Sequence, residues 1–261
     1  MMARLITICL RMGDIMKEYK ILLVEEKIQG KIEKVLDSYD VEGIELEYCW
    51  KEHTPRRLFS GVFPLAGKDG IGFSFCVEVP HNKLKANKTE HKTKVFFDDC
   101  LEIFLQPENS SIYYGIELNG NGTCLDYRVF IHENTNGDGK VILPKELEKS
   151  LAYDGGEKIF GYFTDKVALE TLTFDYDWKA NGTVSSEVKD EYWMLEVFIP
   201  WSDFGLEKAP KEGTVWRGTL NRIDSSLPRG AKQGFLCLLD EPEVVSFHQP
   251  KKFASFSFQN L

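Results

Sequence analysis

Apolar and polar residues alternate at every second position in many parts of this chain, and this pattern limits how it can fold. In the run 71–79, five apolar residues share one face and four other residues share the opposite face: Ile71, Phe73, Phe75, Val77 and Val79 against Gly72, Ser74, Cys76 and Glu78. Alternation of this kind predicts a β-strand with one buried face. We expect further strands where it recurs, at 101–106, 112–119, 169–174, 192–199, 215–223, 235–239 and 253–258.

Turn-forming residues separate these runs. The segments AGKDGIGFSF (66–75) and LNGNGTCLDYR (118–128) each place a Gly/Asn/Asp cluster between two strand-like runs, which predicts hairpins. Helical spacing is confined to 28–38 and, after Pro144, to 145–151. We therefore predict an all-β fold, a jelly-roll-like antiparallel β-sandwich with one or two short peripheral helices.

The domain organisation is predicted to be simple. No Pro-rich or Gly/Ser-rich linker divides the chain, so we expect one domain over residues 16–261. The apolar run at 5–10 is shorter than a usual signal-peptide core and too short to span a bilayer. We interpret residues 1–15 as a disordered tail or a start-site artefact, because Met16 opens a more natural beginning. The prediction is a cytoplasmic protein without a membrane partner, with secretion left open.

Charge and cysteine content narrow the class of protein further. The net charge of −9 disfavours binding to a phosphate backbone, so nucleic acid is not an expected partner. None of the six cysteines forms a C-x-x-C pair, and most lie in apolar strand-like runs. We expect reduced cysteines in the core and a reducing compartment. No cofactor is predicted, with calcium as the one open possibility.

The segment 95–128 carries the most informative chemistry. Alternation places Glu102 with Phe104 on one face of a first strand, and Glu117 with Asn119 on one face of the next. If the two strands pair through the turn at 107–111, these groups converge on one surface patch. Carboxylates and amides bind sugar hydroxyls, and an aromatic ring covers the apolar face of a pyranose. A half-exposed sheet with a polar solvent face explains the same pattern.

The same segment resembles the family 9 carbohydrate-binding modules. The resemblance rests on FFDDCLEIFL (96–105) and YYGIELN (113–119), followed in order by WMLEVFIP (193–200), VWRGTLNRID (215–224) and FHQPKKFASFSF (247–258). It covers roughly residue 43 to the C-terminus. The family implies a jelly-roll-like β-sandwich that binds sugars, in some members between two aromatic rings.

By position, the resemblance implies that Phe96 is the first stacking ring, Glu102 a sugar-contacting carboxylate and Arg222 a late-strand arginine of the site. Phe96 stands where characterised members have Trp, and FLCLL (235–239) replaces the segment of the second ring. Alternation also places Arg222 in a core-facing row with Trp216. The predicted function is non-catalytic binding of a mono- or oligosaccharide. The predicted site residues are Phe96, Glu102, Glu117, Asn119 and Arg222.

Other readings remain open at this point. The carboxylates of Asp98, Asp99 and Glu102 are also compatible with a glycoside hydrolase or its accessory domain. Asp98 and Asp99 are adjacent, however, which is more typical of a turn or cap. A haem-binding sandwich would need a methionine ligand such as Met194, for which packing is the expected role. NTNGDGKV (134–141) resembles a calcium loop but is interpreted as a solvated turn. An interaction module that binds no sugar is the last alternative.

Overall fold

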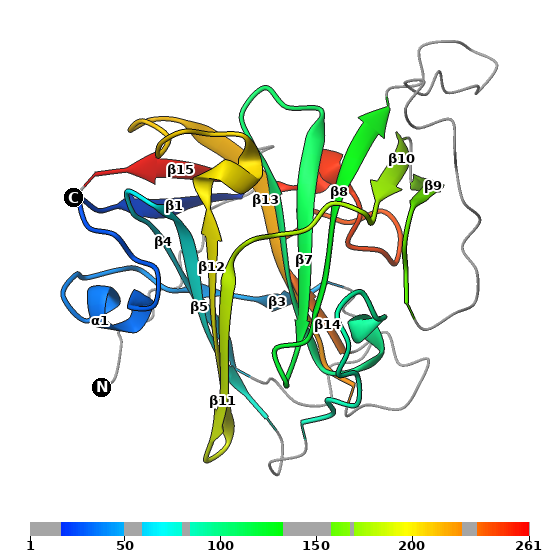
Figure 1. Cartoon of the computed structure of the whole chain (residues 1–261), viewed down its shortest axis with the longest axis horizontal. Coiled ribbons are helices and arrows are strands. Elements are labelled where there is room, and N and C mark those ends of the chain that lie inside the picture. Colours follow the sequence, from blue (N-terminus) through cyan, green and yellow to red (C-terminus); the bar gives the residue numbers. More distant parts are fainter. Residues whose placement is uncertain are drawn as a thin grey trace.

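The computed structural model describes residues 17–49, 59–79, 84–132, 158–167, 170–225 and 234–260. Strands dominate these residues, and the predicted all-β sandwich is confirmed (Figure 1). Both predicted hairpins form, with 60–66 antiparallel to 70–78 and 112–119 antiparallel to 124–132. None of the helices that the structure describes is long and apolar enough to cross a bilayer.

The strands form one hydrogen-bonded path that folds over on itself. Its first half runs through β11 (Thr183–Lys189), β12 (Tyr192–Pro200), β5 (Gly70–Glu78), β4 (Ser60–Ala66) and β1 (Glu18–Leu23). Its second half runs through β15 (Ala254–Gln259), β13 (Val215–Ile223), β6 (Cys100–Gln106), β7 (Ile112–Asn119), β8 (Cys124–His132), β10 (Glu170–Asp175) and β9 (Tyr162–Val167). The parallel pairing of β1 with β15 joins the halves. Short strands β2 (Ile44–Glu45), β3 (Glu47–Tyr48) and β14 (Phe235–Cys237) pair alongside.

The inner core lies between the two halves of the path. Apolar side chains from β4, β5 and β12 pack against those from β6, β7, β13 and β15, with Trp193, Trp216 and Phe258 among the largest. A second cluster covers the other face of β6, β7 and β8, and it is rich in aromatic rings: Phe104, Tyr113, Tyr127, Phe174 and Phe253. We call it the outer aromatic cluster. Both faces of the central strands are therefore buried, which alternation alone does not predict.

Helix is minor, as expected. The predicted helix at 28–38 shortens to α1 (Ile32–Leu36), whose Ile32 and Val35 pack with Ile28 against Leu65 and Phe198. Its contact with the back of β4, β5 and β12 fixes it at the periphery of the sandwich (Figure 1). The second predicted helix, at 145–151, and the expected tail at 1–15 lie outside the described residues.

Candidate functional site

Strands β6 and β7 bring two of the predicted site residues together. They pair antiparallel through the turn at 107–111, so that Glu102 lies directly opposite Glu117 and Cys100 opposite Asn119. The neighbouring positions Leu101 and Ile103 point to the inner core. The predicted pairing and the shared face of the two carboxylates are thus confirmed, and they follow from the two-residue period of a strand.

The expectation that this face is a surface patch is wrong. Glu102 and Glu117 are each only 3% exposed. Tyr127 Oη donates a hydrogen bond of 2.6 Å to Glu117 Oε1, and Asn221 Nδ2 donates one of 3.2 Å to Glu102 Oε2. Glu117 Oε2 is buried, and no described residue forms a hydrogen bond with it. The physical reason is that the outer aromatic cluster and the chain after β14 pack over the face that alternation leaves open.

Burial dominates the electrostatics of the carboxyl pair. Desolvation, followed by the charge of Glu117, raises the pKa of Glu102 well above its ordinary value. Desolvation raises the pKa of Glu117 to about 7, although the hydrogen bond from Tyr127 acts in the opposite direction. Desolvation also raises the pKa of the neighbouring Cys100 thiol, with the two glutamates adding to the effect. Burial therefore favours the protonated form of this carboxyl pair.

His248 lies at the centre of the outer aromatic cluster. Its ring stacks on Phe104, with centroids 4.7 Å apart and planes 14° apart, and meets Phe174 edge-on at 4.9 Å. Tyr113 Oη and His248 Nδ1 are hydrogen-bonded at 2.8 Å. Because the ring is buried, the pKa of His248 falls to about 3, and the imidazole is neutral. His248 therefore packs over the sheet as a neutral ring.

The predicted stacking ring Phe96 lies in a 3-10 helix (Val95–Phe97) just before β6. It is half-buried and packs against the outer aromatic cluster. Its neighbour Phe97 is 53% exposed, and the two ring centroids are 4.8 Å apart with planes at 54°. The ring pair, and Phe97 above all, is therefore the part of this segment that solvent reaches.

Asn119 and the acidic pair that precedes β6 hold loops in place. Asn119 Nδ2 donates to the carbonyl of Lys88 at 2.8 Å and to Asp98 Oδ2 at 2.9 Å. Asp99 accepts backbone N–H groups of Lys85 at 2.5 Å and of Ser225 at 2.8 Å. The expectation that Asp98 and Asp99 serve as a turn or cap is confirmed, and Asn119 belongs to the same network.

Arg222 lies on the face of the sheet opposite Glu102, in the core-facing row that alternation indicated. It pairs with Leu101 in register, whereas its neighbour Asn221 pairs with Glu102. Its guanidinium donates to Ser60 Oγ at 2.6 Å and to the backbone carbonyls of Phe59 at 3.3 Å and Glu78 at 2.6 Å. The structure therefore does not bring Arg222 together with the carboxyl pair.

Asn221, Thr219 and Tyr127 are polar residues of this face that the sequence analysis missed. Thr219 Oγ1 donates to Asn221 Oδ1 at 2.7 Å and accepts from the backbone N–H of Leu238 at 3.3 Å. The signal was present, because the alternation that places Arg222 in the core row places Asn221 and Thr219 on the other face. Tyr127 alternates in the same way along β8 and lies opposite Gly115, the glycine whose missing side chain leaves room for its ring.

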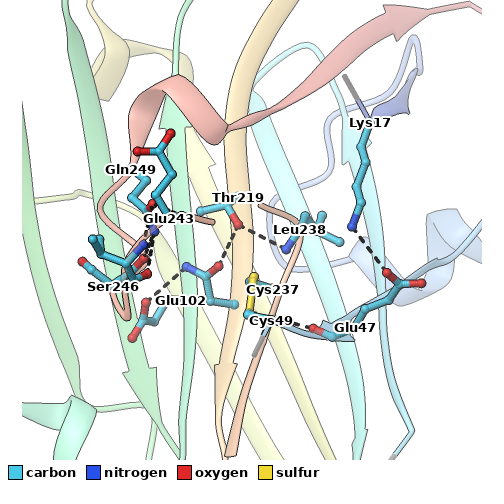
Figure 2. The surroundings of a disulfide bond; sticks show 12 residues. Lys17, Glu47, Cys49, Glu102, Thr219, Cys237, Leu238, Glu243, Ser246 and Gln249 are labelled. Atoms are coloured by element: carbon cyan, nitrogen blue, oxygen red, sulfur yellow. Dashed lines mark hydrogen bonds and ion pairs between the residues drawn. A yellow bond between two sulfur atoms is a disulfide. The ribbon is translucent and has the colours of Figure 1, made fainter. Parts of the chain in front are cut away.

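Two cysteines correct the expectation of fully reduced thiols. Cys49 and Cys237, 188 residues apart, form a disulfide with Cα atoms 5.8 Å apart. Figure 2 shows it beside Thr219 and Leu238, where β14 leads into the chain that covers the carboxyl face. Spacing along the sequence carried no sign of it because the partners meet only through the β3–β14 pairing. Cys76, Cys100 and Cys124 are free thiols.

A second polar cluster surrounds Asp126 on β8. The Lys92 ammonium lies 2.6 Å from Asp126 Oδ1 and donates to the carbonyls of Asp126 and Trp178. His91 Nε2 is also 2.6 Å from Asp126 Oδ1, and the Ala180 N–H donates to Oδ2 at 2.6 Å. Although Cys124 lies close by, Lys92 already supplies the cation that this carboxylate needs.

Two expectations concern other ligands. The calcium-like loop at 134–141 lies outside the described residues. Met194, on β12, lies opposite Cys76 of β5 and Glu187 of β11, on the face away from the inner core. His248 belongs to the outer aromatic cluster on the other half of the path. The packing role expected for Met194 agrees with this placement.

Comparison with known proteins shows that the segment 62–153 matches the model of Carbohydrate-binding family 9. Among solved structures, a "putative carbohydrate-binding protein" from Bacteroides uniformis superposes with a TM-score of 0.60 at 18% identity, covering 94% of this chain and 100% of that one. Two structures of a family 9 module from Caldicellulosiruptor kristjanssonii, with cellotriose and with glucose, each give a TM-score of 0.54. Their identities are 11% and 10%, with 94% of this chain and 95% and 97% of theirs covered. No curated protein matches. Residues 62–153 are thus similar to Carbohydrate-binding family 9, and the chain as a whole shares the fold of the family 9 modules.

Proposed function

We propose that this chain binds carbohydrate without cleaving it, with the Phe96–Phe97 ring pair as the surface that the sugar meets first. The observation that carries the proposal is the family 9 match over 62–153, which contains the ring pair and both carboxylates. The module from Caldicellulosiruptor kristjanssonii, whose fold this chain shares, has been solved with cellotriose and glucose. A glucose unit or a short β-glucan is therefore the first ligand to test.

The exposure of the rings supports this assignment. An exposed aromatic ring covers the apolar C–H face of a pyranose, and Phe97 is the more exposed ring of the pair. Glu102 follows the ring pair by only a few residues, on β6, but its side chain is buried. The rings therefore make the first contact, and a direct role for Glu102 requires the chain over it to move.

The geometry of the carboxyl pair favours binding over hydrolysis. Glycosidases place two carboxyl groups about 5–9.5 Å apart on either side of the bond they cleave. Glu102 and Glu117 are cross-strand neighbours with oxygens within 4.8 Å of each other, and both are buried. A glycosidic bond cannot pass between side chains so placed, so a non-catalytic module is the better supported function.

Calorimetric titration of cellotriose and glucose into wild type, Phe97→Ala and Glu102→Gln tests the proposal. Phe160→Ala is the matched control because Phe160 is an exposed phenylalanine, 60% exposed, on a different segment. We expect Phe97→Ala to weaken binding about tenfold, in the range of one lost aromatic contact, and Phe160→Ala to leave it unchanged. A loss in Glu102→Gln alone would move the site to the buried carboxylates. If a wider panel of mono- and oligosaccharides also failed to bind wild type, the proposal would be overturned.

A further inference from the structure

Three potential metal-ligand side chains meet on the covered face of β6 and β7. Cys100, Glu102 and Glu117 each offer one donor atom, and these atoms all lie within 4.8 Å of one another. All three residues are buried. Strand geometry creates the cluster, since Cys100 and Glu102 are two positions apart on β6 and Glu117 lies opposite Glu102.

The cluster has no basic side chain paired with it in the described segments of the chain. Like charges directly opposite each other on paired strands are destabilising, and buried charges in proteins are usually paired or coordinate a metal. Within the part of the chain that the structure describes, no lysine, arginine or histidine forms an ion pair with Glu102 or Glu117. No described residue forms a hydrogen bond with Glu117 Oε2, which is costly for a buried carboxylate oxygen. Something must therefore satisfy this oxygen, either a proton or a cation.

The cluster around Asp126 shows a second buried carboxylate, whose charge is neutralised by a lysine. There a buried carboxylate lies beside Cys124 and His91, but the Lys92 ammonium fills the position of a cation. Among the residues that the structure describes, no ammonium or guanidinium group pairs with Glu117 in this way. The two clusters thus differ in whether a side-chain cation already neutralises the buried carboxylate.

The surrounding hydrogen bonds orient the carboxylates as they do around metal sites. Tyr127 holds Glu117 by Oε1 and leaves Oε2 unbound, while Asn221 holds Glu102 by Oε2. Such bonds fix the orientation of metal-binding carboxylates. Zinc bonds to sulfur and oxygen are about 2.0–2.3 Å long, so two donors on one ion lie at most about 4.4 Å apart. Donors already within 4.8 Å need only small side-chain movements to meet this limit.

We propose that Cys100, Glu102 and Glu117 form a binding site for one divalent cation of the zinc class, with Glu117 Oε2 as one of its donors. One thiolate and two carboxylates suit zinc, because thiolate favours borderline-soft ions over calcium and magnesium. The site differs from the calcium loop considered at 134–141, and it is independent of sugar binding at Phe97.

The test uses the full chain without reductant, so that the Cys49–Cys237 disulfide stays intact. After removal of metal with a chelator, Zn²⁺ is titrated in competition with a chromophoric chelator, and Co²⁺ is titrated with detection of its thiolate charge-transfer absorption. We expect one ion per chain, a Co²⁺–thiolate band and a higher unfolding midpoint with Zn²⁺. Cys100→Ser and Glu117→Gln are expected to weaken binding by about tenfold or more and, for Cys100→Ser, to abolish the band.

Cys124→Ser is the control, since Cys124 is a free thiol of the cluster that Lys92 already neutralises. It should retain full binding and the Co²⁺ band. Glu117→Gln keeps an acceptor for Tyr127 and nearly the same shape, so it serves if Cys100→Ser does not fold. Absence of Zn²⁺ binding by wild type would overturn the proposal, as would a band that Cys124→Ser removes and Cys100→Ser keeps. Sugar is absent throughout, so failure here is separate from failure of carbohydrate binding.

Discussion

Asn221 Nδ2 and Glu102 Oε2 are hydrogen-bonded at 3.2 Å, so β13 contributes Asn221 to the carboxyl face. Its neighbour Arg222 points the other way, to Ser60 and the end of β5. The position that family resemblance assigned to the sugar site is therefore occupied here by an arginine that links strands inside the sandwich. Asn221 thus contacts the carboxyl face, whereas Arg222 links strands inside the sandwich.

Replacing Arg222 with Met tests the structural role. The change removes the guanidinium that donates to buried Ser60 Oγ and to the carbonyl of Glu78, and we expect the free energy of unfolding to fall by about 2–4 kcal/mol. Urea denaturation measures the loss. Sugar affinity, measured on the folded fraction, should stay within about twofold, a change of roughly 0.4 kcal/mol. Unchanged stability together with lost sugar binding would return Arg222 to the binding site.

Stability should depend on pH through His248. Its pKa is about 3 in the folded protein and near 6.5 when exposed, so the unfolded chain takes up more protons between these values. Stability is therefore fully present above about pH 6.5 and declines as the pH falls toward 3, by up to about 1.4 kcal/mol per pH unit. Urea unfolding of wild type and His248→Phe across this range measures the effect. A difference between the two that does not vary with pH would contradict it.

Lys92 should contribute strongly to stability through a buried ion pair. Its ammonium, within 2.6 Å of Asp126 Oδ1, neutralises a buried carboxylate. Lys92→Met removes the buried ammonium and leaves the carboxylate with only His91 and the Ala180 N–H among the described residues, and we expect a loss of about 3–5 kcal/mol in unfolding free energy. The exposed Lys68→Met, whose partner Glu25 is also exposed, is the control and should change stability by less than about 1 kcal/mol. Equal effects of the two substitutions would show that burial does not matter here.

The Cys49–Cys237 disulfide predicts a thiol count and a redox effect. Six cysteines less the two in the bridge leave four thiols to react in denaturant without reductant. Reduction should lower the free energy of unfolding by about 2–4 kcal/mol, since it releases a long loop in the unfolded chain. The variant Cys49→Ser/Cys237→Ser should match the reduced protein. Six reactive thiols in protein isolated without reductant would contradict the bridge and would agree with the reducing compartment first expected.

Much of the fold followed from short stretches of sequence. The ranges of β5, β7, β12 and β13 agree with the predicted runs to within one residue, because alternation and turn residues act over a few positions. The pairing of Glu102 with Glu117 was predictable for the same reason, since a short turn sets the register of a hairpin. By contrast, the boundaries of α1 could not be predicted from the sequence. They depend on where Ile32 and Val35 pack against the sheet.

By itself, then, the sequence determined the strands, their faces and the local hairpins, which depend on a backbone repeat of two residues. Only the tertiary structure decided that the face of Glu102 and Glu117 is covered, because this depends on chain more than a hundred residues away. His248 stacks on Phe104 and Asn221 bonds to Glu102 through such distant contacts, and the Cys49–Cys237 bridge spans a still longer separation. Alternation shows that two faces differ, but burial depends on what packs against each of them.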